Sequence, residues 1–487
     1  MESAARRDSI ATWALVMLAA ACAVVASVRA SSLYGLGIDG DAAWTLSAGA
    51  SLARGHGLVT CLDEVFSLWP PLYPCVMAGI DWLGLDVLSS LRLLHLVALA
   101  STVVLGARLA WEVSRSQVAA AATAGSLALT YRLHEYTIQV VSETLFLPLV
   151  LGALLVACSL ERSFTTRKFV ALAALSALAC LQRYLGVTLV GAVALYASWS
   201  PRWGSPLQRV RRAAVYAAVS LAPLGAWFLR NRSVESSWTG GRDATEVTLA
   251  DALAAALATL RSWAAPVHAD GLAWVVLGAV VLLVVALALH RTESRAALTL
   301  LVTFCAVYFV ALVGMASTVV LDGIGDRLML PLLVPLVTLA WSGALAAWRV
   351  PLWVAGLLIA LAWLDAAPKT SEKVAAWTEQ GAGGFHTRVW QEHAVTRALR
   401  QSELAAPCWS NGPELVWLEK RISVRFLRGG AKAWERAAVE AGKSGGSLAW
   451  FQDGGRPPAF PDVLQAHVRA EPLAEVRDGL LLRLAPR

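Results

Sequence analysis

The amino-acid sequence predicts an all-α polytopic membrane protein that ends in a small soluble α/β domain. Hydrophobic residues make up 57% of the chain and charged residues only 15%, and the mean hydropathy is +0.59. These values are typical of proteins that cross a membrane several times and argue against an ordinary soluble protein. Apolar segments recur over residues 1–366, whereas charged residues, glycine and proline become frequent over residues 367–487. We therefore expect a transmembrane domain followed by a soluble domain with this boundary.

About eleven apolar segments are expected to cross the membrane, because a crossing helix needs about 20 mostly apolar residues and shorter ones are tolerated where neighbours bury them. They lie near 11–30, 88–108, 117–131, 139–160, 168–182, 184–199, 212–230, 271–289, 296–317, 328–347 and 350–366. The first segment has a basic start like that of a signal peptide. Its apolar run is long and no convincing cleavage site follows, which favours an uncleaved anchor.

The basic residues orient these segments, because cytoplasmic loops carry an excess of Lys and Arg. Arg6 and Arg7 precede the first segment, so the N-terminus is expected in the cytoplasm. The basic residues of the later gaps are Arg108, Arg115, Arg162, Arg167, Lys168, Arg202, Arg209, Arg211, Arg212, Arg291, Arg295 and Arg349. All of them lie on the cytoplasmic side only if the stretch from Trp69 to Asp86 does not cross the membrane. We expect a re-entrant or interfacial helix there, opened by Pro70 and Pro71, and an extracytoplasmic C-terminal domain.

Composition and motifs exclude several function classes. The net charge of +7 is explained by the cytoplasmic loops and requires no nucleic-acid partner. The sequence contains no P-loop, GxGxxG, HExxH or GxSxG motif, and the pairs Gly429–Gly430 and Gly445–Gly446 are interpreted as turns. Arginine greatly outnumbers lysine, which indicates a GC-rich bacterial genome and favours the bacterial inner membrane.

The first outer loop, residues 31–87, is longer than a bare connector between two spans requires. Asp39 and Asp41 follow the first apolar segment, and the apolar spacing that comes next suits a helix lying along the membrane surface. Cys61 and Cys75 are both expected outside, where a disulfide can form, and the sequence leaves open whether they pair. These residues fit a functional loop, and they equally fit a connecting loop without a function whose acidic turn is solvated.

Polar residues gather at the outer ends of the predicted spans. They are Asp39, Asp41, Arg132, His134, Glu135, Glu143, Arg183, Tyr184, Arg230, Asn231, Asp322, Asp326 and Arg327. Ionisable groups at membrane depth are costly, so they usually line a cavity or pair with one another. Their shared level predicts one polar chamber. The alternative is a set of separate ion pairs that fix helix ends.

Three local strings carry further expectations. Arg183, between two short apolar segments, can hold a lipid phosphate or anchor the helix at the interface. Glu143 lies just inside an apolar span, which indicates a buried partner or a ligand contact. Arg230 and Asn231 open an outer loop of about forty residues that can be a lid or a linker.

The C-terminal region, 367–487, is expected to form a small α/β domain. Short β-like runs occur at Leu415–Leu418, Leu448–Phe451 and Leu480–Leu484, and Ala431–Ala441 is helical in pattern.

Several strings together resemble a known family. Asp41-Ala42-Ala43-Trp44, Leu52-Ala53-Arg54-Gly55-His56-Gly57-Leu58 and Trp69-Pro70-Pro71-Leu72-Tyr73-Pro74 resemble the first outer loop of GT-C fold glycosyltransferases of the protein mannosyltransferase and lipid A aminoarabinose transferase superfamily. Further similar strings follow in order: Ser142-Glu143-Thr144-Leu145-Phe146, Gln182-Arg183-Tyr184-Leu185-Gly186, Leu229-Arg230-Asn231, Asp326-Arg327-Leu328-Met329-Leu330-Pro331 and Ser410-Asn411.

The resemblance implies transfer of a sugar from a polyprenyl-phosphate donor to a glycan, lipid or protein acceptor at the extracytoplasmic face, with inversion at the anomeric carbon. It also implies that an acid of the first outer loop is the base, which by spacing to the Gly-His-Gly string is Asp41. The family often has two adjacent acids at this point, whereas here the other acid is Asp39, so Asp41 and Asp39 are the expected catalytic residues. Trp69 stands where the aminoarabinose branch has a basic residue, so the resemblance does not extend to that sugar.

The chemistry of such a transfer suits these residue types. A hydroxyl acceptor needs a carboxylate to take its proton, and a departing lipid phosphate needs fixed cations. The residues expected to bind the donor phosphate or substrate are Arg183, Tyr184, Glu143, Arg132, His134, Arg230, Asn231, Asp326 and Arg327. Asp39-Gly40-Asp41 formally reads DxD, a metal-binding pattern for nucleotide diphosphates. A lipid monophosphate donor removes that requirement, so no obligatory metal or other cofactor is expected.

Two other function classes fit part of the sequence. A secondary transporter also has many spans and buried charges, but it should show two related halves with broken helices near the midplane. The sequence shows no such halves. A catalytically inactive membrane scaffold of a cell-envelope pathway can share the same fold. Asp41 and Arg183 favour an active transferase.

Overall fold

The computed structural model describes residues 2–264, 295–321, 323–346, 351–427, 431–451, 466–476 and 479–487. The predicted span 271–289, Asp322 and the Gly429–Gly430 turn lie outside the described residues. The chain forms two compact units. We call the first, Met1–Ala30, Ser67–Leu72 and Arg92–Ala375, the helical unit. The second, Ser31–Phe66, Tyr73–Leu91 and Ala376–Arg487, is called the loop-and-tail unit because it combines most of the first outer loop with the C-terminal region.

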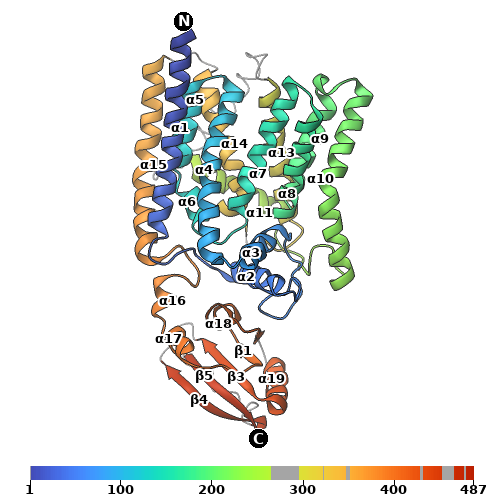
Figure 1. Cartoon of the computed structure of the whole chain (residues 1–487), viewed down its shortest axis with the longest axis vertical. Coiled ribbons are helices and arrows are strands. Elements are labelled where there is room, and N and C mark those ends of the chain that lie inside the picture. Colours follow the sequence, from blue (N-terminus) through green and yellow to red (C-terminus); the bar gives the residue numbers. More distant parts are fainter. Residues whose placement is uncertain are drawn as a thin grey trace. The chain divides into compact units, whose positions relative to one another are not determined.

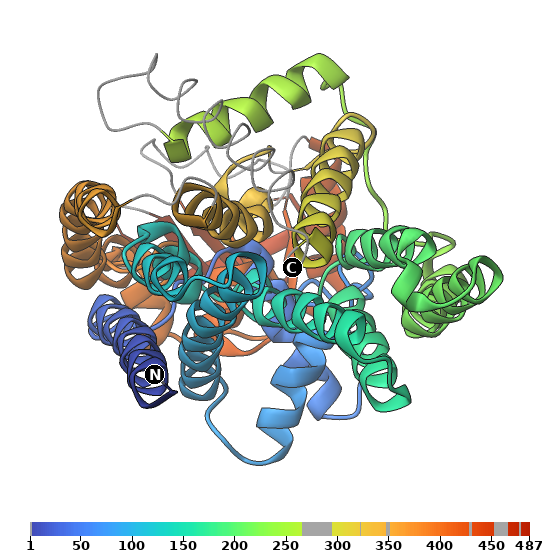
Figure 2. The same cartoon turned by 90° about the horizontal axis from the view of Figure 1, so that it is seen from above.

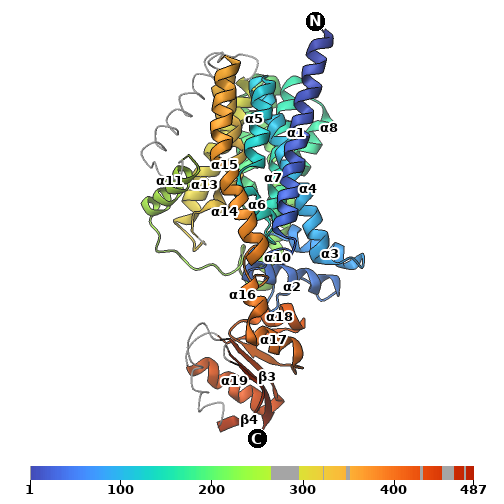
Figure 3. The same ribbon diagram turned by 90° about the vertical axis from the view of Figure 1, so that its left-hand side faces the viewer.

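The helical unit consists of helices that mostly run along one direction (Figure 1 and Figure 3). Its helices, some of which extend into the other unit, are α1 Glu2–Ala30, α4 Val87–Ser114, α5 Gln117–Ala128, α6 Tyr131–Thr137, α7 Glu143–Arg162, α8 Thr166–Gln182, α9 Gly186–Trp199, η1 Pro201–Trp203, α10 Pro206–Glu235, α11 Leu249–Ala264, α13 Arg295–Ala316, α14 Asp326–Ala346 and α15 Leu352–Gln380. Figure 2 shows most of this bundle end-on and α11 lengthwise, so α11 lies across the bundle axis. The sequence did not predict α11.

Among the described residues, six helices are long and apolar enough to cross a membrane. These candidate spans are Ser9–Ala30, Val87–Ser114, Glu143–Arg162, Pro206–Glu235, Arg295–Ala316 and Asp326–Leu345. The predicted spans near 117, 168 and 184 are also helices, but they have only 12, 17 and 14 residues. The expected fold class, an all-α polytopic membrane protein with a small α/β tail, is confirmed.

Small residues let the helices approach closely. α5 packs on both α1 and α14, and its buried face includes Ala119, Ala120 and Ala124. A Cβ at Gly106 of α4 would lie 2.6 Å from a methyl group of Leu127. Such small residues permit close helix packing where lipid gives no hydrophobic drive for association.

Two charged clusters mark the ends of α7. At its C-terminal end the buried carboxylate of Glu112 forms salt bridges with Arg108 and Arg115, each with an N–O distance of 2.9 Å, and with Arg162. Glu143 begins the same helix and is buried in a second cluster, described below. The 20 residues of α7 separate the two ends by about 28 Å at 1.5 Å per residue, close to the thickness of a bilayer core. The charges therefore bracket an apolar layer of the expected depth.

The loop-and-tail unit contains one five-stranded sheet with the order β2-β1-β3-β5-β4 (Figure 1). The strands are β1 Cys408–Ser410, β2 Val424–Phe426, β3 Gly446–Phe451, β4 Val468–Val476 and β5 Gly479–Pro486; the tail helices are α16 Arg388–Glu392, α17 Ala394–Gln401, α18 Pro413–Lys420 and α19 Ala431–Ser444. β1 pairs in parallel with β2 and β3, and the other pairings are antiparallel. Side chains alternate across the sheet: Trp409 packs with α19, whereas Cys408 packs with α17 and α18.

The predicted strand at Leu415–Leu418 is wrong, because these residues lie in helix α18. Pro413 stands in the first turn, and Arg421 ends the helix in a left-handed conformation, φ +57°. A short apolar run does not by itself distinguish a buried strand from a buried helix, and these capping signals decide it. The predicted strands at Leu448–Phe451 and Leu480–Leu484 and the helix at Ala431–Ala441 are confirmed.

The first outer loop folds into two helices, α2 Gly40–Ala53 and α3 Leu72–Trp82. α3 has 11 residues, about 16 Å, which is too short to cross a bilayer core. Gly84 follows it in a left-handed conformation, φ +71°, which ends the segment as predicted. Cys61 and Cys75 are free thiols, so the possible disulfide is not formed.

A close backbone crossing precedes α2. Phe385 donates its backbone N–H to the carbonyl oxygen of Ile38 at 2.7 Å, and Ile38 forms a parallel bridge with Gly384. Gly384 has φ +63°, and a Cβ there would lie 1.9 Å from the Ile38 oxygen. Only glycine permits both this backbone conformation and this approach.

We expect Gly384→Ala to destabilise the protein more than Gly35→Ala. Both alanines must adopt a left-handed backbone, which costs about 1–2 kcal/mol. A Cβ at Gly35 meets nothing within 4 Å, whereas one at Gly384 clashes with Ile38. Gly35→Ala should therefore show the conformational cost alone and Gly384→Ala a larger loss. Thermal unfolding of the purified variants measures the difference, and equal midpoints would contradict the crossing.

Candidate active site

A row of alternating charges links the ends of four elements in the helical unit. Asp326 and Arg327 open α14, and the first pairs with Arg132 of α6 while the second pairs with Glu143 of α7. Glu143 also pairs with Arg183, which ends α8. Three guanidinium groups and two carboxylates make up this charge row, which therefore has an excess of one positive charge.

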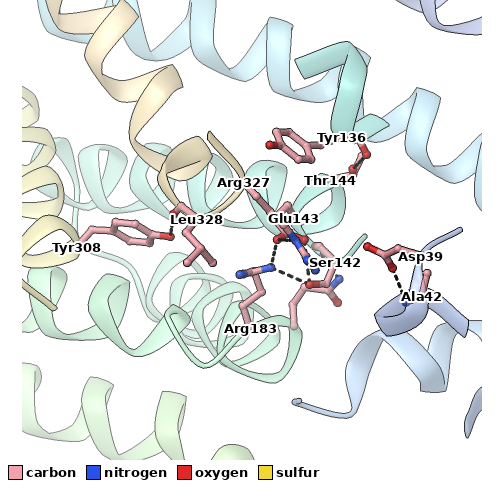
Figure 4. A network of polar contacts seen from close by, with 11 residues as sticks. Asp39, Ala42, Tyr136, Ser142, Glu143, Thr144, Arg183, Tyr308, Arg327 and Leu328 are labelled. Carbon is pink, nitrogen blue, oxygen red and sulfur yellow. Dashed lines mark hydrogen bonds and ion pairs between the residues drawn. The ribbon is translucent and has the colours of Figure 1, made fainter. Parts of the chain in front are cut away.

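Glu143 is the buried centre of the charge row (Figure 4). Its side chain has no exposed surface, and its Oε1 accepts from Nε of Arg327 at 2.7 Å and pairs with Nη1 of Arg183. Ser142 lies beside it and accepts from Nη1 of Arg183 at 3.1 Å. An ionised carboxylate is buried only when it is paired and hydrogen-bonded. Glu143 therefore fixes the positions of two arginines.

The arginines remain partly accessible. Their side chains are 13% exposed at Arg183 and 26% at Arg327. Within the described part of the chain, both side-chain contacts of Arg183 run through Nη1, and neither Nε nor Nη2 has a partner. A guanidinium presents five N–H donors in a planar fork that matches phosphate or carboxylate oxygens. The arrangement therefore suits an anionic ligand with two or more oxygens.

The carboxylate of Asp326 accepts hydrogen bonds from side chains of two different helices. Arg132 donates from Nε at 3.0 Å, and Trp263 of α11 donates from its indole Nε1 at 2.5 Å. Glu135 lies near this end of the row. Burial raises the pKa of Glu135, and the negative charge of Asp326 raises it further. Trp263 was not among the residues predicted from sequence, because nothing in its neighbourhood marks it as a partner of Asp326.

The side chains of Tyr184 and Asn231 both bind the backbone at Ser67. The Tyr184 hydroxyl donates to the carbonyl oxygen of Ser67 at 3.0 Å, and Nδ2 of Asn231 donates to the same oxygen at 3.3 Å. Asn231 is fully buried and also accepts from Nη1 of Arg230 at 3.0 Å. Both side chains therefore fix the start of the Trp69-Pro70-Pro71 string.

His134 is fully buried, and both of its ring nitrogens have partners within the protein. Nε2 lies 2.8 Å from the carbonyl oxygen of Ala128, so it donates, and Nδ1 then accepts from the Ser27 hydroxyl at 2.9 Å. Burial lowers the pKa of His134. The neutral ring ties α1, α5 and α6 together.

The two loop acids belong to the loop-and-tail unit and differ in their contacts. Asp39 is the N-cap of α2, and its Oδ1 accepts from the backbone N–H of Ala42 at 2.8 Å. Asp41 lies in the first turn, where the helix N-terminus favours a negative side chain. Its backbone carbonyl accepts from the Thr45 hydroxyl at 2.8 Å. That the loop acids and the polar groups at the helix ends share one chamber stays a prediction.

Among the residues that the structure describes, no group of three or more His, Cys, Asp and Glu side chains is arranged to hold a metal ion. The expectation of a metal-independent reaction stays a prediction.

Comparisons with known proteins give a fold but no sequence relative. No protein-family model matches the chain, and no curated protein matches it in sequence. The structure has the GT-C fold. It is similar to ArnT from Cupriavidus metallidurans bound to undecaprenyl phosphate, with a TM-score of 0.66 and 12% identity over 97% of this chain and 98% of that chain. The apo crystal structure of the same protein matches with a TM-score of 0.63 and 13% identity, covering 98% of each chain.

Removing Glu143 should destabilise the protein strongly. Glu143→Ala leaves two neighbouring guanidinium groups without their shared carboxylate, and breaking such a buried pair costs about 3–5 kcal/mol. Glu392→Ala is the control, because it breaks an exposed pair with Arg388, and such pairs contribute about 0–1 kcal/mol. Thermal unfolding in detergent compares the two. Similar losses would show that Glu143 does not organise the charge row.

Proposed function

We propose that this protein is an integral-membrane inverting glycosyltransferase. It transfers a hexosyl or pentosyl group from a polyprenyl-phosphate donor to a glycan, lipid or protein acceptor at the extracytoplasmic face. The observation that carries this proposal is the buried Glu143, which holds Arg183 and Arg327 together in a fold shared with a protein that binds undecaprenyl phosphate. A secondary transporter or an inactive scaffold does not require both these fixed arginines and an acidic loop that resembles that of the transferase family.

The charge row is suited to the phosphate of the donor. A lipid monophosphate carries its charge on oxygens that a guanidinium can bind in a bidentate manner. Arg183 offers Nε and Nη2 for such contacts, and the row has one positive charge in excess. Because the arginines are already fixed by Glu143, they need no reorganisation as negative charge develops on the departing phosphate.

Asp41 is the proposed base. As the acceptor oxygen forms its bond to the anomeric carbon, the bond from that carbon to the phosphate oxygen breaks, and the polyprenyl phosphate leaves with the bonding electrons. The proton of the acceptor hydroxyl passes to the carboxylate of Asp41. Asp39 is assigned a different role, because its carboxylate caps α2 and so helps to hold Asp41 in place.

The protein crosses the membrane several times, and the bacterial inner membrane is its proposed location. The N-terminus is placed in the cytoplasm by the charge rule, and the C-terminal region outside. The donor lipid is its proposed partner in the membrane, and neither a metal nor another cofactor is required by the proposed reaction.

Asp41→Asn should abolish most of the transfer, whereas Asp39→Asn should not. A general base contributes about 10²–10⁴-fold to a rate, and an amide cannot take the acceptor proton. Asparagine caps a helix as well as aspartate does, so Asp39→Asn should stay within about threefold of the wild type. Transfer of labelled sugar from polyprenyl-phosphate donors measures both, at matched protein levels. Equal activity of Asp41→Asn and the wild type would refute the assigned base.

Arg183→Lys should slow transfer while keeping the charge. Lysine can still pair with Glu143 but lacks the planar fork, so we expect kcat to fall by about 10- to 100-fold. Arg108→Lys is the matched control, because Arg108 also pairs with a buried glutamate, at the other end of α7. That variant should turn over like the wild type. Equal losses in the two variants would assign Arg183 a structural role only.

A further inference from the structure

We propose that Glu414, in the C-terminal region, is a positioning residue for Asp41 and acts through Trp44. This inference rests on the proposed function, in which Asp41 is the base. It assigns the tail a part in the reaction: the tail holds the helix that carries the acid. Each contact that supports it lies within the loop-and-tail unit.

The link between the tail and α2 is a hydrogen bond. The indole Nε1 of Trp44 donates to Oε1 of Glu414 at 3.0 Å. Trp44 follows Asp41 by three residues, and side chains at that spacing are neighbours on a helix surface. A Cβ at Gly40 would lie 3.9 Å from the same oxygen. The Glu414 carboxylate therefore lies against the first turn of α2, where Asp41 stands.

The tail presents Glu414 rigidly. β1 ends at Ser410, whose hydroxyl accepts from the backbone N–H of Gly412 at 3.0 Å. Asn411 bonds both backbone groups of Phe451 at the end of β3, at 2.7 and 2.8 Å. Helix α18 then starts at Pro413, and its residues Leu415, Val416 and Trp417 are buried in the tail. These contacts leave the start of α18 little freedom, so Glu414 is a firm anchor.

Two further contacts attach the loop to the tail on either side of α2. Before the helix, Phe385 donates to the carbonyl oxygen of Ile38. After it, Val424 of β2 donates its N–H to the carbonyl oxygen of Cys61 at 2.8 Å, and the Cys61 N–H donates to the hydroxyl of Ser47 in α2. The Glu414 contact lies between these two along the loop, and it reaches the face of α2 next to Asp41.

Such an anchor matters for the reaction because α2 is short. It has 14 residues, and helices of that length are marginal without tertiary contacts. A catalytic group must be held within about 0.5 Å of its productive position. Loss of the anchor should therefore lower kcat. The KM for the donor should change little, because the proposed phosphate-binding arginines belong to the helical unit.

The test uses the full-length protein with Glu414→Ala, Glu414→Gln, Trp44→Phe and the double variant Trp44→Phe with Glu414→Ala. Glutamine has an oxygen that still accepts from Trp44, so it should restore activity to within about threefold. Loss of one hydrogen bond to a charged group should reduce kcat by about tenfold in each of the other single variants. The double variant should be no slower than either single one, because both remove the same contact. Glu392→Ala, an exposed tail carboxylate, should match the wild type.

Hydrogen–deuterium exchange of peptides covering Gly40–Ala53 gives a readout that does not depend on turnover. Exchange should rise in Glu414→Ala and Trp44→Phe but not in Glu414→Gln, with β1 and β3 peptides unchanged as a check on folding. Additive losses of kcat, failure of Glu414→Gln to restore it, or unchanged exchange in α2 would overturn the proposal. A wild type that transfers no sugar from any donor would refute the proposed function instead, and the exchange would still decide whether Glu414 anchors α2.

Discussion

A buried carboxylate that must be neutralised is the interaction on which the helical unit depends. Glu143 begins α7 without any exposed side-chain surface, so its charge is tolerable only if cations reach it. Arg183 comes from the end of α8 and Arg327 from the start of α14. The requirement therefore draws the ends of three helices to one point. It also leaves arginine donors oriented in a place that an anionic ligand can reach.

The acidic loop is organised by a different constraint, which is close contact between backbones. The chain before α2 passes so near to Gly384 that a single Cβ would obstruct it. Asp39 then caps the helix, and Trp44 is held by Glu414. The loop thus takes its shape from the C-terminal region, which groups with it in one compact unit although more than 300 residues separate Trp44 from Glu414 in sequence. In the proposed transferase, the tail is a support for the base.

Several polar residues that were predicted to bind substrate form hydrogen bonds within the protein itself. His134 uses both ring nitrogens to join helices, and Asn231 is buried against the carbonyl oxygen of Ser67. Tyr184 donates to the same oxygen. The sequence predicted substrate binding for these three residues as it did for Arg183 and Arg327. A polar side chain near a helix end can contact either a ligand or a backbone group, and the sequence does not distinguish the two. Their contacts favour positioning roles.

The sequence by itself determined the class of fold, whereas the sidedness of its charges stays a prediction. Hydropathy and segment length predict spans, and helical spacing predicted α2, because both signals are local. Local patterns failed at Leu415–Leu418, where a short apolar run fits a helix as well as a strand. Only the tertiary structure decided which charges meet: Glu143 and Arg327 are 184 residues apart, and Trp44 and Glu414 are 370 apart. Such pairs are selected by the packing of whole elements, because the sequence near one partner contains no information about the position of the other.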